Sequence, residues 1–196
     1  VHNYYWFAND SVVNVNTSAQ TYTINNATGD VTLLINGSAT NQSGTYGVQT
    51  NASASTLYGS VTLYRNGTDV TSQNNVFVTL AANYYNYTAV STGDQNHSSA
   101  SATLFVTISK AQSVVNLNLN GTDGNITIIQ DSTIPLNLTT ITGDSGATLR
   151  LYRADVLINQ GTSPIGNYST FNSIGVFNIT GFYIDSENYT GSFETW

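Results

Sequence analysis

The sequence predicts an all-β protein made of two tandem immunoglobulin-like β-sandwiches, and three observations support this. β-branched and aromatic residues alternate with polar ones between clusters of Gly, Asn and Asp, and no helical periodicity is sustained. The strand-like runs recur at the roughly 8–12 residue spacing typical of sandwiches. The second half of the chain also repeats the first, since Leu63-Tyr64-Arg65 returns as Leu151-Tyr152-Arg153.

The repeat sets the expected domains. Thr45–Arg65 aligns on Thr133–Arg153 at a shift of 88 residues, and after a four-residue insertion the shift becomes 92. At that shift Asn86-Tyr87-Thr88 matches Asn178-Ile179-Thr180, and Asn96-His97-Ser98 matches Asn188-Tyr189-Thr190. We therefore expect sandwiches over residues 18–110 and 111–196, joined at Lys110-Ala111-Gln112 without a flexible linker.

Each domain divides into seven expected strands. In the first domain they lie near residues 20–25, 31–36, 45–51, 57–65, 75–81, 84–90 and 101–109. In the second domain they lie near residues 113–119, 125–130, 133–141, 147–153, 155–159, 173–182 and 189–196. Asn-Gly pairs at Asn36, Asn66 and Asn120 predict tight hairpin turns, because Asn and Gly tolerate positive φ.

The second copy stops one strand early. The first copy continues through Leu104, Val106 and Ile108, whereas the second ends at Thr195-Trp196, opposite Thr103 and Leu104. The sequence thus predicts a second sandwich that lacks its last strand.

An unmatched strand-like segment, residues 1–17, stands at the start of the chain, and we expect it to be a free donor strand for a neighbouring copy. Two faces compete for burial in the acceptor. The favoured even face presents Tyr4, Trp6, Ala8 and Val12 but also Asp10, and the odd face presents Tyr5, Phe7, Val13 and Val15 but also Asn9. A glycan on Asn9 could not be buried, which favours the even face.

Asn-x-Ser/Thr glycosylation sequons are in excess. There are fifteen, whereas chance predicts about six from this composition. The asparagines are Asn9, Asn16, Asn26, Asn36, Asn41, Asn51, Asn66, Asn86, Asn96, Asn120, Asn125, Asn137, Asn167, Asn178 and Asn188. In five of them the middle residue is apolar, so that in a strand Asn and Thr face solvent together. We expect covalent N-glycans at these positions and an extracellular protein.

Composition limits the partners. Charged residues make up 8% of the chain and the net charge is −7, with four Lys and Arg in total, which argues against nucleic acid. No apolar run reaches the roughly 18 residues of a membrane span, and no signal peptide is visible, so Val1 is read as the first residue left after cleavage. The absence of Cys excludes disulfides.

We expect neither catalysis nor a cofactor or metal. Asp94, His97 and Ser98 lie too close along one loop to form a triad by spacing alone, and Asp30, Asp123 and Asp144 read as turn residues. Lys110, the single lysine, is read as a solvated junction charge, with a Lys–Asn isopeptide cross-link as the alternative.

The paired Leu-Tyr-Arg strands, the Asn-Tyr-Thr and Asn-Ile-Thr strands and the Gly-Asp-Gln-Asn-His-Ser stretch over residues 45–196 resemble immunoglobulin-like repeats of archaeal surface proteins. Together with the free first strand, the sequons and the lack of Cys and Met, the chain resembles the subunit of archaeal threads. That resemblance implies a glycosylated cell-surface filament that polymerises head to tail with itself by donor-strand complementation, in adhesion or biofilm formation.

Two other functions stay open. The chain could be a module of a longer surface-layer or adhesin protein, with the missing strand encoded beyond Trp196, and the encoded stop codon would decide. It could also be a carbohydrate-binding module that uses Tyr4, Tyr5 and Trp6 as a stacking platform, and glycan binding by the monomer would decide. The anchoring protein is not identified by the sequence.

Overall fold

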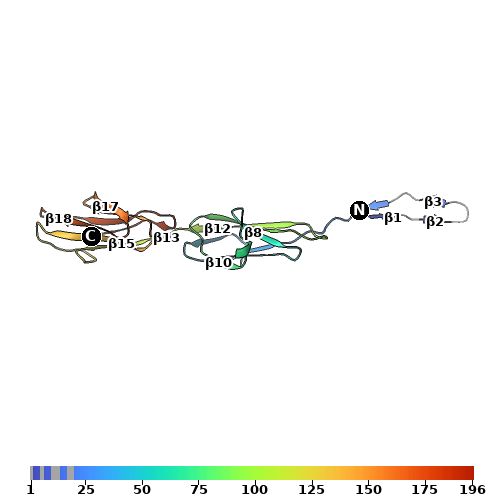
Figure 1. Ribbon diagram of the computed structural model, residues 1–196, viewed down its shortest axis with the longest axis horizontal. Helices are drawn as coiled ribbons and strands as arrows, with labels where there is room; N and C mark the ends of the chain where they lie inside the picture. The colour runs from blue at the N-terminus through green and yellow to red at the C-terminus, as the bar shows by residue number, and fades with distance from the viewer. Residues whose placement is uncertain (1, 5–6, 10–13, 17–19) are drawn as a thin grey trace.

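The protein is all-β, as expected from the sequence. The computed structural model describes residues 2–4, 7–9, 14–16 and 20–196, with side chains from residue 23 onward, and these residues form strands and one 3-10 helix, η1 (Thr71–Gln73). Figure 1 shows two groups of sheets in a row, with a hairpin beyond the first group and the carboxyl terminus part-way along the second. We call residues 23–110 the first repeat and residues 111–196 the second repeat.

The start of the chain differs from the expected single strand. β1 (His2–Tyr4) pairs antiparallel with β4 (Gln20–Tyr22), and β2 (Phe7–Asn9) pairs with β3 (Asn14–Asn16). The hairpin therefore runs past residue 17, because the alternating residues 20–22 supply a partner for β1 within the same chain. Of the expected donor residues, Tyr4 and Ala8 lie in this hairpin, and Trp6 and Val12 lie outside the described residues.

Two sheets make up the first repeat. Its strands are β5 (Thr32–Ile35), β6 (Gln42–Thr45), β7 (Thr50–Ser55), β8 (Val61–Arg65), β9 (Thr68–Asp69), β10 (Val76–Val78), β11 (Tyr84–Ser91) and β12 (Ala100–Ser109). One sheet has the order β10-β7-β5 and the other β6-β12-β11-β8-β9. β6 runs parallel to the end of β12, and the other pairings of β12 and β7 are antiparallel.

The second repeat has two main sheets and a short parallel pair. Its strands are β13 (Ala111–Gln112), β14 (Val114–Leu119), β15 (Thr133–Thr142), β16 (Thr148–Arg153), β17 (Val156–Thr162), β18 (Ile165–Thr170), β19 (Ile179–Tyr183), β20 (Tyr189–Thr190) and β21 (Ser192–Thr195). The sheet orders are β14-β15-β18 and β17-β16-β19-β21, and β13 pairs with β20.

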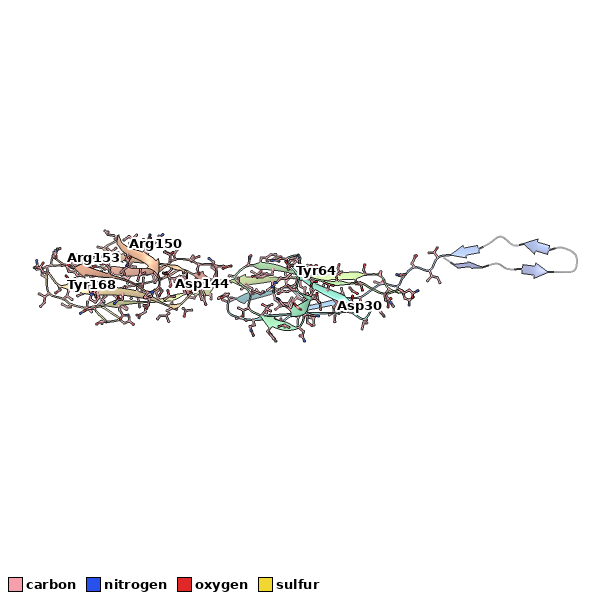
Figure 2. All side chains as sticks on the ribbon, in the orientation of Figure 1. Asp30, Tyr64, Asp144, Arg150, Arg153 and Tyr168 are labelled. Atoms are coloured by element: carbon pink, nitrogen blue, oxygen red, sulfur yellow. The ribbon has the colours of Figure 1, made fainter. Side chains whose placement is uncertain are left out.

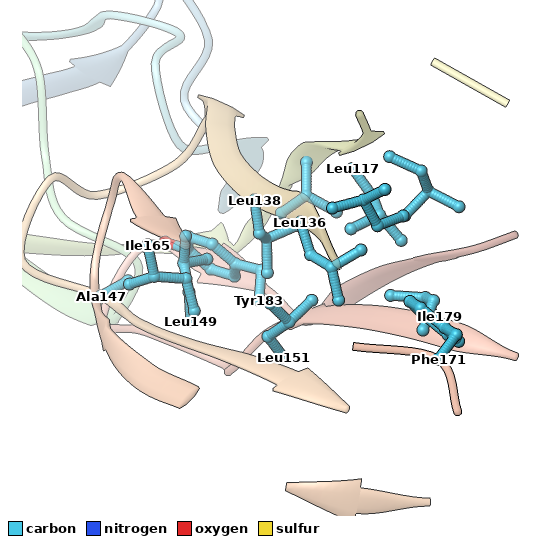
Figure 3. Close-up of a cluster of buried hydrophobic side chains, with 13 residues drawn as sticks. Leu117, Leu136, Leu138, Ala147, Leu149, Leu151, Ile165, Phe171, Ile179 and Tyr183 are labelled. Carbon is cyan, nitrogen blue, oxygen red and sulfur yellow. The ribbon is translucent and has the colours of Figure 1, made fainter. Parts of the chain in front are cut away.

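Each repeat has its own apolar core. The first core is built from residues between Leu33 and Ile108 and the second from residues between Val115 and Tyr183, and among residues 23–196 the two share no buried residue. The alternation of the strands supplies these side chains, since every second residue points between the sheets. Figure 3 shows Leu117, Leu136, Leu138 and Leu151 interdigitating in the second core, all completely buried.

The expected Asn-Gly turns are confirmed. Asn36, Asn66 and Asn120 have φ of 51°, 49° and 51°, and the glycines that follow them also have positive φ. These are the left-handed conformations of type I′ hairpin turns.

Expected strands fail to form at three places. Residues 46–49, inside the strand expected near 45–51, form the turn between β6 and β7. In the second repeat, residues 125–130 have no strand at all, and the strand expected from residue 173 begins only at Ile179. These two stretches of the second repeat have strand-like sequences but no partner strand. β9, β18 and most of β6 lie outside the strands expected from the sequence.

The two repeats touch through a small set of contacts around Lys110. Ala82 N–H of the first repeat donates to Asn188 Oδ1 of the second at 3.0 Å, and the rings of Tyr46 and Tyr189 meet edge to face at 5.4 Å. Figure 2 shows Asp144 where the second repeat meets the first. Within the described part of the chain, no helix is long and apolar enough to cross a membrane.

Candidate functional site: an open groove in the second repeat

The strand registers give the equivalence of the two repeats. Thr88 pairs with Thr103 in the first repeat, and Thr180 pairs with Thr195 in the second, each pair with its hydroxyl oxygens 3.0 Å apart. The next pair is Tyr87 with Leu104 in one repeat and Ile179 with Trp196 in the other, where the backbones exchange two hydrogen bonds of 2.9 and 3.0 Å. Trp196 therefore stands where Leu104 stands, and the shift of 92 is confirmed at this strand.

In the first repeat, β12 continues for five residues beyond Leu104. Phe105, Val106 and Thr107 pair antiparallel with β11, and Val106–Ser109 pair parallel with β6. Val106 and Ile108 point inward and are 1% and 4% exposed. This stretch of β12 covers the first core and joins β6 to β11.

In the second repeat, the same two edges border a cavity of about 580 Å³. One edge is residues 125–130 and the other residues 173–179, with Trp196 at the inner end and Phe171 among the lining residues. We call this cavity the open groove. Its position explains the two missing strands. In the first repeat, β6 and residues 84–86 of β11 both pair with the end of β12. Among the described residues, no strand lies at the equivalent place in the second repeat.

The groove edge formed by residues 125–130 is far more apolar than its counterpart in the first repeat. Ile126, Ile128 and Ile129 replace Gln42, Gly44 and Thr45 of β6, at a shift of 84 residues that the turn-closing bridges Ile35–Ser38 and Leu119–Thr122 establish. Ile129, Ile174 and Val176 are 83%, 90% and 96% exposed. Contiguous apolar surface of this kind marks an interaction site.

The floor of the groove is preformed. Arg153 lies over the ring of Phe171 at 4.1 Å and near that of Phe177 at 5.1 Å, and its Nη1 donates to Thr170 O at 2.8 Å. Trp196 Nε1 donates to Leu117 O at 2.9 Å, which fixes the indole at the inner end. These contacts hold the aromatic side chains in place without an occupant.

Most of the sequon asparagines described with side chains face solvent. Nine are exposed, namely Asn26, Asn36, Asn41, Asn66, Asn96, Asn120, Asn125, Asn137 and Asn178, and Asn86 and Asn167 are half-buried. The Oδ1 atoms of Asn36 and Asn66 accept backbone N–H bonds of 2.8 Å, which leaves their Nδ2 atoms available. Asn9 and Asn16 have no described side chains.

Two sequon asparagines are buried, and for Asn188 this contradicts the expected outward position in a strand. Asn51 and Asn188 are 7% and 9% exposed. Asn188 Nδ2 donates to Asp144 Oδ1 at 3.4 Å, its backbone N–H donates to Asp144 Oδ2 at 3.2 Å, and the first repeat covers it. Sequence reasoning missed this because Ala82, the covering residue, lies 106 positions away.

The remaining polar candidates have ordinary structural partners. Lys110 Nζ lies 3.1 Å from Asp185 Oδ2 at the junction, and Asp123 Oδ2 accepts a 3.0 Å bond from Asn116. Asp94 Oδ1 lies 2.8 Å from His97 Nδ1, and this hydrogen bond holds the pKa of Asp94 below its usual value. Asp30 accepts from the Leu57 N–H at 3.0 Å. Among the described residues, no three His, Cys, Asp or Glu side chains gather as metal ligands would.

No protein-family model and no curated protein matches the sequence. Among solved structures, the fibronectin(III)-like modules of Clostridium thermocellum CbhA align at 13% identity over 84% of this chain and 91% of that chain, with a TM-score of 0.33. The titin domains z1z2, solved in complex with telethonin, align at 14% identity over 88% and 95% of the two chains, with a TM-score of 0.35. A β-glucuronidase of Parabacteroides merdae aligns at 11% identity over 86% of this chain and 25% of that chain, with a TM-score of 0.31.

Proposed function

We propose that the protein is the subunit of a glycosylated extracellular filament, in which the N-terminal segment of one copy completes the open groove of the next. The observation that carries the proposal is the groove itself. A β-strand fits it because both edges have the sequence and spacing of strands whose partner is absent. A partner strand would cover Ile126, Ile128 and Phe177, which are half-buried against the second core, and each fully buried apolar side chain contributes about 1.5–3 kcal/mol.

The N-terminal segment is the occupant we favour. Its described strands pair only with one another, as β1 with β4 and β2 with β3, and Figure 1 shows this hairpin at the opposite end of the chain from the second repeat. A segment at one end and a groove at the other produce a head-to-tail contact, which extends without limit unless the rotation closes a ring.

The exposed sequons support a glycosylated extracellular filament. Nine sequon asparagines are exposed, and the chain has 8% charged residues, so sugars would supply the solubility that charges supply elsewhere. The function in adhesion or biofilm formation is an extension of this proposal, with no enzymatic activity or cofactor assigned.

The experiment is removal of residues 1–25 from the full chain. The wild type should form filaments in electron micrographs, and the shortened chain should remain monomeric with both cores folded by circular dichroism. Normal filaments from the shortened chain would contradict the proposal.

A module of a longer surface protein is the second candidate, because residues following Trp196 in the same chain would fill the groove equally well. In that case a longer chain that includes those residues should be monomeric, because its own residues fill the groove.

A further inference from the structure

The structure also indicates which residues enter the groove. The two repeats begin with the same backbone contacts, and these contacts show which residues are equivalent. Ala27 N–H donates to Asn96 O at 2.8 Å and Ala111 N–H donates to Asn188 O at 2.9 Å, and each alanine forms a parallel bridge to the residue after that asparagine. Ala27 and Ala111 are therefore equivalent, at the shift of 84 residues.

The residues before Ala111 form the end of β12. Because Ala27 is equivalent to Ala111, the residues before Ala27 are equivalent in sequence position to the end of β12. At the same shift, Phe105–Ser109 corresponds to residues 21–25, Thr-Tyr-Thr-Ile-Asn. Thr23 and Ile24 are identical to Thr107 and Ile108, and Tyr22 is the large apolar residue at the position of Val106. The stretch that the second repeat lacks after Trp196 thus stands directly before the first repeat.

The stretch is free to leave its own subunit. Thr23, Ile24 and Asn25 are exposed, and Ile24 is 66% exposed although it is apolar. The backbone of Thr21 and Tyr22 pairs with Asn3 and His2 of β1. A two-stranded ribbon of this kind is marginal in water, so its pairing can be exchanged for a position between two edges.

We propose that residues 21–25 of a second copy fill the open groove, with Tyr22 and Ile24 pointing inward, so that the junction between copies repeats the junction between the two repeats. This inference rests on the proposed filament function and differs from the sequence-based expectation of Tyr4, Trp6, Ala8 and Val12. By the register of β12, Thr23 lies opposite Val176 and Tyr22 opposite Phe177 on one edge. On the other edge Ile24 runs parallel to Ile128, as Ile108 does to Gly44.

Paired cysteines test the register in the full chain, which has no cysteine of its own. Facing residues of an antiparallel pair have Cα atoms about 4.5–5.5 Å apart, within disulfide range. The variant Thr23→Cys/Val176→Cys should give a ladder of disulfide-linked oligomers on a non-reducing gel after mild oxidation. The matched variant Ala8→Cys/Val176→Cys should give none.

The outcomes separate this register from the filament proposal. Suppose that filaments are seen in micrographs but the ladder comes only from Ala8→Cys/Val176→Cys, or from neither variant. That result would overturn the register and would still agree with the filament proposal. A disulfide within a single chain would overturn the register as well. A wild-type chain that forms no oligomer at all would overturn the filament and the register together.

A second pair of variants tests which face points inward. Ile24→Asp should reduce filament yield at least ten-fold, and Thr23→Asp should leave it within about two-fold, because Thr23 faces solvent as Thr107 does. Both positions are exposed in the subunit, so neither variant should change the melting temperature of the monomer. Equal loss of filaments in the two variants would contradict the inward position of Ile24.

Discussion

Gly181 and Leu138 occupy in the second repeat the space that Ala89 and Ala54 occupy in the first, as the strand registers show. A Cβ added to Gly181 would clash with Leu138 Cδ1, and the Leu138 side chain is completely buried. In the second repeat the residue of one sheet is larger, Leu138 for Ala54, and the facing residue of the other sheet is smaller, Gly181 for Ala89. The internal repeat thus supplies a natural comparison for a core substitution.

We expect Gly181→Ala to lower the free energy of unfolding by about 1–3 kcal/mol, because overpacking forces shifts in a dense core. Chemical denaturation of the variant measures the loss. Gly146→Ala is the control, since nothing lies within 4 Å of a Cβ at Gly146. In a Leu138→Ala background the effect of Gly181→Ala should vanish. The same loss in both backgrounds would show that the clash with Leu138 is not the cause.

Asp144 links the junction to the second core. Ser186 Oγ donates to its Oδ2 at 2.7 Å, and Tyr183 Oη donates to Ser186 Oγ at 2.9 Å. The bond from Ser186, followed by those from Asn188, holds the pKa of Asp144 below its usual value. A carboxylate with a lowered folded pKa stabilises the protein above its unfolded pKa, and that contribution is lost as pH falls through the folded value.

Asp144→Asn should therefore melt below the wild type at pH 7, and the difference should shrink in strong acid, below the ordinary carboxylate range. Melting curves over a pH series measure this. The wild type itself should lose stability over this pH range, and the loss should be modest because the chain has eleven Asp and Glu in total. A gap between the two proteins that stays constant down to the lowest pH would contradict the assignment.

Glycan occupancy should follow burial, residue by residue. We expect sugars on most of the exposed sequon asparagines and none on Asn51 or Asn188, since a glycan cannot fit an interior site. Glycopeptide mapping of the protein from its native source gives the answer. Asn96 is the matched control for Asn188, because it holds the equivalent position and is exposed. A glycan found on Asn188 would show that the junction is assembled differently.

At the scale of elements, the sequence predicted structure well where the cause is local. The Asn-Gly turns at Asn36, Asn66 and Asn120 followed from backbone preference alone. The strand expected over residues 125–130 failed because its ladder partner is absent, although its alternation is correct. The alignment of Thr45 on Thr133 is also wrong, for a different reason. At that end it rested on one identity, whereas the bridges Ile35–Ser38 and Leu119–Thr122 make Thr45 equivalent to Ile129 at the shift of 84 residues.

Hydrogen exchange should report the unfilled edges directly. Amides of Ile126–Ile129 and Val176–Asn178 should exchange rapidly in the monomer and become protected in the assembled protein, because a strand added between them supplies carbonyl acceptors. The amides of β15 and β16 should be protected in both states and serve as the control. Edge amides that exchange equally fast in monomer and assembly would exclude strand addition at this groove.

At the scale of the whole molecule, the repeats, the groove and residues 21–25 form one continuous pattern. The second repeat ends at the equivalent of Leu104, and the pattern resumes at the equivalent of Phe105 in front of the first repeat. The sequence alone predicted an incomplete repeat and a spare segment. It did not give the register, because the equivalence of Ala27 and Ala111 depends on backbone contacts to Asn96 and Asn188, which a comparison of side chains does not show.

A peptide of residues 20–26 should stabilise the chain that lacks residues 1–25. Ligand binding to the folded state adds RT ln(1 + [L]/Kd), or about 2.7 kcal/mol at a concentration 100 times Kd. The gain should appear in the unfolding of the second repeat, followed by the fluorescence of Trp196, and not in that of the first, because only the second has the open groove. The same peptide with Asp at the position of Ile24 is the control. Equal stabilisation by both peptides, or stabilisation of the first repeat, would show that Ile24 does not bind in the groove.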